Sequence, residues 1–301
     1  MQKNIALQLF GHLRSYEYVY ISLIEKIVIP NKKKGYNVDI FIHTWNETDH
    51  STKTWHNQKA EQRGTHITEK IKNQIIEIYN PKKILITEQI DVEDNELKIK
   101  VNDINISYKV IVNMAYTKYM VNKLRMEYSK DNNIKYDYVI TTRPDILFKT
   151  EFIIDDFLKL FTDNNIPIPN NAIFYGYKPF ARGLVEYKYF LVGSDIIYFA
   201  KEETMNKATN LYQKIENKVL DINYFKDNLY TMVYISYSNW ILENLEPIPI
   251  KYLYEAGDYI IVRTKDANDI KKKTFIQKLI WWIPIKFVRD KLRKKYGIEN
   301  F

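Results

Sequence analysis

Short apolar runs alternate with helical periodicity in the first half of the chain. The runs are rich in β-branched and aromatic residues, which is typical of buried strands, and they span residues 4–10, 36–45, 83–87 and 136–142. Between them, apolar positions recur at helical spacing or fill helix-length stretches over residues 16–29, 67–79 and 108–130. The resulting β-α-β-α-β-α-β order predicts a mostly parallel sheet with helices on both faces.

After residue 148 the pattern becomes irregular and predicts an α+β second half. Helices are expected at 153–161, directly after Asp195 (as an N-cap), and at 201–215 and 225–245; strands are expected at 172–175, 189–192 and 251–262. Pro30 is expected to end the first helix. No repeat or flexible linker divides residues 1–270, so we expect one domain whose halves are 1–148 and 149–270.

The most informative stretch is the fourth predicted strand and the Arg143-Pro144-Asp145 that follows it. Proline has no N–H to donate to a sheet, so the strand must stop or turn there. Asp145 is thereby placed at the carboxyl end of a strand, where ligands bind in open α/β sheets. A carboxylate at this edge can hold a hard divalent cation. The alternative is a surface ion pair between Arg143 and Asp145.

Two other strand ends carry candidate binding residues. Gly11 ends the first strand, and Arg14 and the predicted N-cap Ser15 follow it, an arrangement that favours anion binding. A simple tight turn is the alternative. His43 and Trp45 lie on one face at the end of the second strand, where they could contact a nucleotide or close the core.

Composition narrows the choice of function. The chain of 301 residues has no cysteine, which excludes disulfides and thiolate chemistry, and five scattered histidines form no zinc pattern. The net charge is +8, and residues 271–301 contribute ten positive and two negative side chains, so residues 1–270 are close to neutral. A nucleic-acid-binding protein would more often carry its basic surface on the folded domain. We therefore expect no nucleic-acid partner.

The basic segment 271–301 also contains Trp281, Trp282 and several large aliphatic residues. Adjacent tryptophans with a lysine–arginine face predict a basic amphipathic helix lying on an anionic membrane surface. Its apolar core is too short and too charged to span a bilayer, and the first residues show no signal-peptide layout. The alternative is a helix packed on the domain with its basic face in solvent.

In order, these features resemble bacterial GT-A-type glycosyltransferases of surface-polysaccharide and lipooligosaccharide biosynthesis. The matching pieces are LQLFGHLR (7–14), DIFIHTW (39–45), NMAY (113–116) and YDYVITTRPDI (136–146). They cover about the first half of the chain, and only their combination is specific. The resemblance implies a Rossmann-like α/β fold, a nucleotide-sugar donor (a UDP-sugar in preference to a GDP-sugar) and a nucleotide pocket lined by Gly11, Arg14, His43, Trp45, Arg143 and Asp145.

The chain departs from the family at one position. Such enzymes usually carry Asp-x-Asp, which binds the metal and the donor diphosphate, whereas here the first acidic position is Arg143. Either Asp145 alone holds Mg²⁺ or Mn²⁺, or Arg143 with Arg14 neutralises the diphosphate and the metal matters less.

The resemblance also implies transfer to a glycan or lipid-linked acceptor, at the inner face of the cytoplasmic membrane. An inverting enzyme needs a base for the acceptor hydroxyl. Asp195 and Asp227 rank first because both are predicted at helix starts, ahead of Glu243 and Glu255. A retaining mechanism would need no such base. The rival function is a non-catalytic carbohydrate- or lipid-binding α/β protein at the membrane surface.

Overall fold

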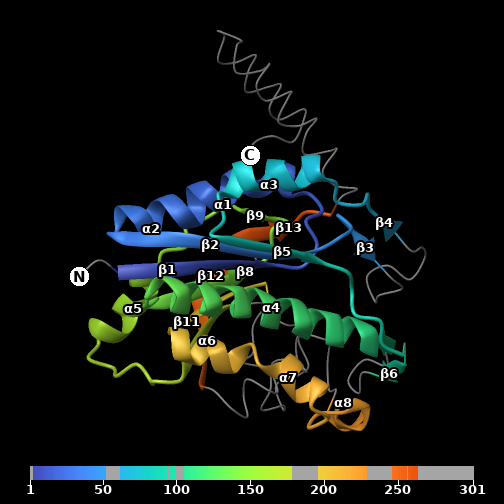
Figure 1. Cartoon of the computed structure of the whole chain (residues 1–301). Helices are drawn as coiled ribbons and strands as arrows, with labels where there is room; N and C mark the ends of the chain where they lie inside the picture. Colours follow the sequence, from blue (N-terminus) through green and yellow to red (C-terminus); the bar gives the residue numbers. More distant parts are fainter. Residues whose placement is uncertain are drawn as a thin grey trace, which may run out of the picture.

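The computed structural model describes residues 3–51, 62–93, 95–98, 105–177, 196–228, 246–255 and 257–263. A seven-stranded sheet with the order β12-β10-β11-β8-β1-β2-β5 forms its centre (Figure 1). These strands are β1 (Lys3–Phe10), β2 (Tyr36–Trp45), β5 (Lys83–Thr87), β8 (Tyr138–Thr142), β10 (Ala172–Tyr177), β11 (Ile197–Ala200) and β12 (Glu246–Glu255). Only β11 runs antiparallel to its neighbours β8 and β10. The predicted mostly parallel α/β sheet is therefore confirmed.

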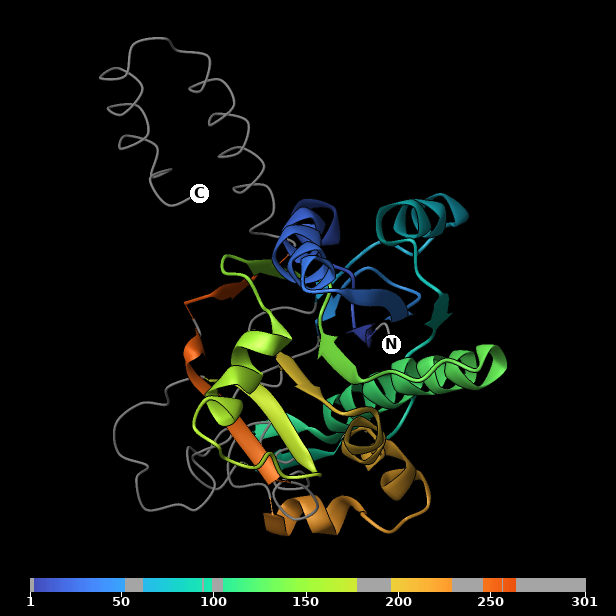
Figure 2. The ribbon, with the colours of Figure 1, turned by 90° about the vertical axis from the view of Figure 1, so that its left-hand side faces the viewer.

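Helices cover both faces of the sheet, as the alternation predicts (Figures 1 and 2). One face carries α1 (Tyr16–Leu23), the π-helical turn η1 (Ile24–Val28), α2 (Ile29–Lys33), α3 (Glu69–Tyr79) and α5 (Ile154–Thr162). The other carries α4 (Tyr108–Asn132), α6 (Glu202–Ala208), α7 (Leu211–Glu216) and α8 (Ile222–Asn228). Short ladders join β3 (His50–Ser51) to β4 (Gln62–Arg63), β6 (Glu96–Lys98) to β7 (Asn105–Ser107), and β9 (Ile146–Phe148) to β13 (Tyr259–Ile261).

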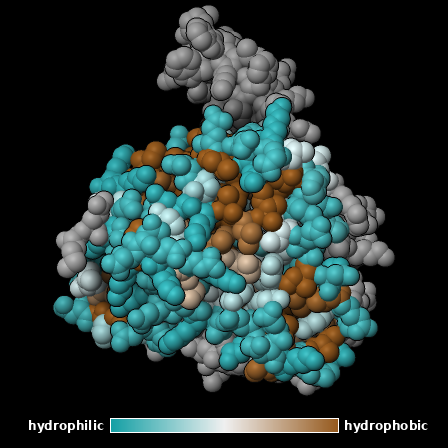
Figure 3. Space-filling model, in the orientation of Figure 1, coloured by the Kyte–Doolittle hydropathy of each residue, from teal (hydrophilic) through white to brown (hydrophobic). Residues whose placement is uncertain are grey.

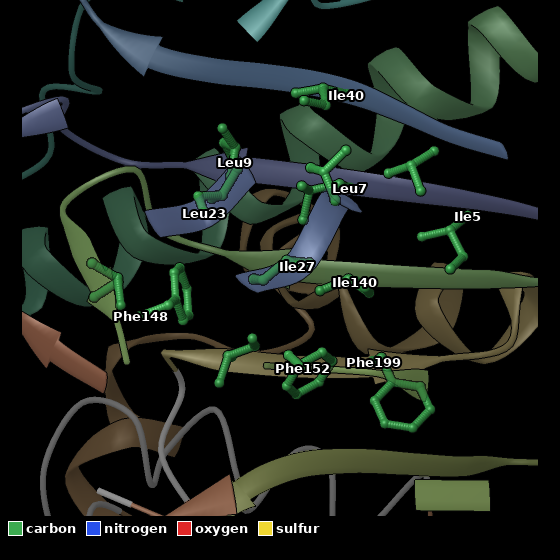
Figure 4. Close-up of a cluster of buried hydrophobic side chains, with 14 of the residues drawn as sticks. Ile5, Leu7, Leu9, Leu23, Ile27, Ile40, Ile140, Phe148, Phe152 and Phe199 are labelled. Atoms are coloured by element: carbon green, nitrogen blue, oxygen red, sulfur yellow. The ribbon is translucent and has the colours of Figure 1, made fainter. Parts of the chain in front are cut away.

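Alternate residues of the strands supply two separate cores. On the α1 face, Leu7, Ile140 and Phe199 pack against Leu23 and Ile27, and Figure 4 shows these side chains filling the space between sheet and helix. On the α4 face, the intervening residues meet Ile111, Ala115 and Val121 of the long helix. A sheet buried on both faces explains why its strands are nearly continuous apolar runs.

The α4 face also holds a buried polar network. Gln8 of β1 donates to Asn122 Oδ1 over 2.8 Å, and the Thr141 hydroxyl donates to Gln8 Oε1 over 3.0 Å. Arg125 of α4 is fully buried and pairs with Glu202 at the start of α6. These polar positions interrupt the apolar stripe of α4, which is buried on more than one side because it packs on both the sheet and α7.

The first helix does not end at Pro30, contrary to the prediction. It passes through η1 and continues as α2, with Pro30 in the first turn of α2. Proline has no N–H for the carbonyl four residues earlier, and that carbonyl, Lys26 O, accepts from the Phe152 N–H over 2.7 Å instead. The π turn that breaks the regular hydrogen-bond pattern lies directly before α2. Asn31 secures the continuation by donating to Ile27 O and to Phe152 O.

The second half differs from the prediction in three places. Residues 197–200 form strand β11, so no helix directly follows Asp195, and the next helix begins at Glu202. The predicted 201–215 helix is divided into α6 and α7. The predicted last strand is two strands, β12 and β13. The predicted strand 189–192 and most of the predicted helix 225–245 lie outside the described residues.

Apolar surface gathers over α3 and the edge strand β5 in Figure 3. Ile76 of α3 is exposed there, and Ile84, Leu85 and Ile86 of β5 are half-buried. In the described part of the chain, no helix combines the length and the apolar character needed to cross a membrane.

Candidate functional site

The carboxyl ends of β1 and β8 lie side by side at the point where the sheet order reverses. The chain leaves β1 for β2 on one side and later returns to β8 on the other, and Leu9 pairs with Thr142 in parallel register. In open α/β sheets such a switch point leaves a crevice in which ligands bind. The loop of Gly11 to Ser15 and the segment Arg143-Pro144-Asp145 both start at this point.

Asp145 lies at the centre of an arginine cluster. Its carboxylate accepts from Arg143 Nε over 2.8 Å and from Arg143 Nη2 over 2.6 Å, in a bidentate fork. Arg14 Nη1 donates to the same carboxylate over 2.9 Å. Asp145 is 0% exposed, so the Arg143–Asp145 pair exists but is not the surface pair of the alternative interpretation. Burial acts to raise the pKa of Asp145, and the charges of Arg143 and Arg14 outweigh it, so the pKa lies below its ordinary value.

Arg14 reaches this position through an unusual backbone conformation. Its φ is +45°, a left-handed value that non-glycine residues seldom adopt, and Gly11 has φ +89°. The Arg14 N–H donates to Thr48 O over 2.7 Å, and its Nε donates to Asp49 Oδ1 over 2.8 Å. Ser15 stands at the N-cap as predicted, but its hydroxyl donates to Val262 O and caps no helix N–H.

Asp49 is a residue of this site that the sequence interpretation missed. It lies just after β2 in a polar segment, where a single acidic residue gives no signal. The Gly64 N–H donates to Asp49 O, and a Cβ on Gly64 would stand 2.4 Å from Asp49 N. Only glycine allows this close approach, so Gly64 helps to fix Asp49 against Arg14.

Arg263 is the second residue that was missed. Antiparallel pairing of β13 with β9 brings the end of the described chain to the cluster, and the Val262 N–H donates to Asp145 O over 2.9 Å. Burial, and next the charges of Arg14 and Arg143, lower the pKa of Arg263 to about 10, while Asp145 and Asp49 act in the opposite direction. Arg263 therefore stays protonated at neutral pH.

His43 and Gly11 share one hydroxyl. The Gly11 N–H donates to Thr117 Oγ1 over 3.0 Å, and the same oxygen lies 2.7 Å from His43 Nδ1. His43 Nε2 lies 3.1 Å from Thr87 Oγ1. The Thr117 hydroxyl has two lone pairs and one proton, so it accepts from the Gly11 N–H and can also pair with His43 Nδ1 in either tautomer of the ring. His43 is fully buried, which agrees with a structural role at this edge.

Trp45 begins a row of aromatic side chains along α4 and α7. It is 3% exposed and stacks on Tyr116 with ring centroids 5.8 Å apart. Tyr116 in turn meets Tyr212 edge to face, with ring centroids 4.9 Å apart. Of the two interpretations of Trp45, closure of the core matches this packing, while Tyr116, from NMAY (113–116), is half-buried beside it.

The four predicted base candidates and the basic segment belong to the second half of the chain, and part of them lies outside the described residues. Asp195 and Glu243 lie outside the described residues, as does the basic segment 271–301. Asp227 lies in the last turn of α8, which begins at Ile222, so its prediction at a helix start is wrong. Glu255 is the last residue of β12. The structure thus brings Gly11, Arg14, Arg143 and Asp145 together, with His43 and Trp45 packed behind the neighbouring strand ends.

A divalent cation does not fit the residues around Asp145. Both of its carboxylate oxygens accept from guanidinium groups, and Arg14, Arg143 and Arg263 would repel an incoming cation. Among the described residues, no three His, Asp or Glu side chains are grouped as metal ligands. The expected Mg²⁺ or Mn²⁺ therefore stays a prediction for experiment.

Scans of protein-family models and of curated proteins found no match to this chain. The geometry of the site therefore carries the functional argument.

Stability is expected to fall as the pH drops from 7.5 to 5.0 because of two buried histidines. Burial lowers the pKa of His43 to about 3, and burial together with the Arg14 charge lowers that of His12 to about 3. The unfolded chain gains these protons near pH 6.5, where the native state does not, so stability is complete above that pH and declines below it. At pH 5.0 each histidine is expected to have removed about 2 kcal/mol, measured by urea unfolding.

The variant His43→Gln provides the control, because it removes one of the two titrations. Its loss of stability between pH 7.5 and 5.0 should be about half that of the wild type, whatever its stability at pH 7.5. The Asp145 carboxyl does not interfere, since its contribution is lost only below its ordinary pKa of 3.8. An unchanged pH dependence would show that His43 is protonated in the native state.

Proposed function

We propose that this protein is a glycosyltransferase that moves a sugar from a nucleoside-diphosphate sugar, a UDP-sugar in preference to a GDP-sugar, to a glycan or glycolipid acceptor. The proposal includes a GT-A-like form of the α/β fold. The observation that carries it is the arginine cluster of Arg14, Arg143 and Arg263 with Asp145 at the switch point of the sheet. A donor diphosphate needs positive charge at this edge.

The chemistry places clear demands on such a site. The acceptor oxygen attacks the anomeric carbon as the bond from that carbon to the diphosphate oxygen breaks, and the electron pair of that bond leaves with the diphosphate. Guanidinium groups aimed at the leaving oxygens stabilise the charge that develops there. The proton of the acceptor hydroxyl goes to a base, for which Asp195 and Asp227 remain our candidates in an inverting reaction.

The location of the acceptor is part of the same proposal. A basic amphipathic segment at 271–301 would hold the enzyme on the anionic inner face of the cytoplasmic membrane, beside a lipid-linked acceptor. Deletion of residues 271–301 should then shift the protein from the membrane fraction to the soluble fraction. An unchanged membrane fraction would contradict this part of the proposal.

The decisive experiment is a thermal-shift panel of UDP-, GDP- and CMP-sugars, followed by a turnover assay. A ligand present at 100 times its Kd should stabilise the native state by about 2.7 kcal/mol. We expect one UDP- or GDP-sugar to raise the melting temperature, and CMP-sugars, which carry a single phosphate, to do so less. Release of the nucleoside diphosphate on addition of acceptor glycans would establish transfer.

Two other outcomes decide against transfer. Binding of sugars or lipids without release of nucleotide would favour the non-catalytic carbohydrate- or lipid-binding protein. If no nucleotide sugar stabilises the protein, the proposed donor site is contradicted.

A further inference from the structure

Among the residues that the structure describes, the arginine cluster carries one more positive than negative charge. Arg14, Arg143 and Arg263 contribute three positive charges, and Asp49 and Asp145 contribute two negative charges. Asp145 is fully buried, and the side chains of Arg14 and Arg143 are 11% and 18% exposed. Charges so poorly hydrated are normally paired, which points to an anion as the missing component.

The contacts of Arg14 with Asp49 and Asp145 leave several arginine donors for that anion. Arg14 uses Nε for Asp49 and Nη1 for Asp145. A guanidinium has five N–H groups, so three of those of Arg14 have no protein acceptor within the described ranges. Arg263 likewise forms no hydrogen bond or ion pair with another described residue, although its neighbour Val262 is tied to both Ser15 and Asp145.

Asp145 has a different role from that of a metal ligand. Its bidentate contact with Arg143 and its contact with Arg14 fix the planes of both guanidinium groups before any ligand arrives. Such preorganisation lowers the cost of ordering two long side chains on binding. Asp49 adds a second support for Arg14 from the β3–β4 hairpin.

We infer that Arg14, Arg143 and Arg263 bind a diphosphate group without a divalent cation, with Arg263 as a recognition residue and Asp145 as a positioning residue. This inference rests on the proposed function only in taking a sugar-donor nucleotide as one source of the diphosphate. The shared chemistry is a diphosphate, which a nucleotide sugar or a lipid-linked diphosphate could carry.

The first test measures the binding of inorganic pyrophosphate to the full chain in EDTA and in Mn²⁺ by calorimetry. We expect similar affinity in both conditions. Arg263→Gln should weaken binding by about 10- to 100-fold, and Arg263→Lys should recover part of it because the charge returns without the fork. The matched control is Lys33→Gln, which removes one exposed positive charge from the end of α2, at the opposite edge of the sheet.

Melting temperatures without ligand show whether each variant is folded, and Arg263→Lys keeps the test valid if Arg263→Gln is unstable. Pyrophosphate that binds only with Mn²⁺, or that binds Arg263→Gln as tightly as the wild type, would overturn the inference.

A second set of ligands separates this inference from the proposed function. UDP, GDP and farnesyl diphosphate are each compared with pyrophosphate in EDTA. Tighter binding of UDP or GDP than of pyrophosphate supports both the inference and the proposed function. If pyrophosphate binds without metal and UDP or GDP binds no more tightly than pyrophosphate, the inference is supported and the nucleotide donor is contradicted. If farnesyl diphosphate binds most tightly, the site is assigned to a lipid-linked diphosphate. A nucleotide sugar that binds only with Mn²⁺ keeps the donor and overturns the inference.

Discussion

Asp145→Asn is expected to destabilise the protein by about 3–5 kcal/mol, the usual cost of removing one member of a buried ion pair. The amide keeps the shape of the side chain but removes its charge, and among the described residues Asp49 is then the remaining carboxylate beside Arg14, Arg143 and Arg263. For a chain of this size the loss corresponds to a drop of about 6–15 °C in melting temperature, which calorimetry would measure.

Asp156→Asn is the matched control. The same substitution there affects an exposed ion pair with Lys34, whose Nζ lies 3.7 Å from Asp156 Oδ1. Exposed pairs contribute little, so the melting temperature should stay within about 2 °C of the wild type. A similarly small change for Asp145→Asn would mean that the arginines are held by other contacts.

Arg125→Met is expected to be comparably destabilising, by about 3–5 kcal/mol. Arg125 is fully buried, pairs with Glu202, and donates from Nη2 to Asn122 Oδ1 over 3.0 Å. Methionine fills much of the same volume but leaves Glu202 without its cation and the asparagine oxygens with fewer donors. Urea unfolding of Arg125→Met gives the change in free energy directly.

The double variant Arg125→Met/Glu202→Gln distinguishes the causes. If the unpaired charge of Glu202 causes most of the lost stability, this variant should be more stable than Arg125→Met alone. Lys123→Met, at an exposed position of the same helix, should change stability by less than about 0.5 kcal/mol. If Arg125→Met resembles Lys123→Met, the Arg125–Glu202 pair contributes little to stability.

The sheet of the first half could be predicted well from the sequence. Strands β2 and β5 have the predicted bounds, because both are runs of β-branched or aromatic residues bounded by turn residues, a pattern that favours strands. Strand β11 was missed because the apolar run around Ile197 to Ala200 is short, and a short run fits the start of a buried helix equally well. The prediction that the first helix ends at Pro30 was wrong because sequence periodicity does not reveal a π turn.

The candidate site was only partly predictable. Gly11, Arg14, Arg143 and Asp145 were found because they follow strand ends that must meet at one edge of a parallel sheet. Asp49 and Arg263 follow no such rule. They are single charged residues in polar surroundings, and only the β3–β4 hairpin and the β9–β13 pairing bring them to the cluster.

The distance of Arg263 along the chain has a consequence for protein synthesis. Ser15 and Val262 are separated by 247 positions and are joined by one hydrogen bond, so a growing chain that has passed Ser15 lacks the third arginine until all of these positions have been synthesised. At about 5–20 residues per second, Arg14 is synthesised roughly 10–50 seconds before Arg263. Truncated products of translation therefore carry an incomplete cluster.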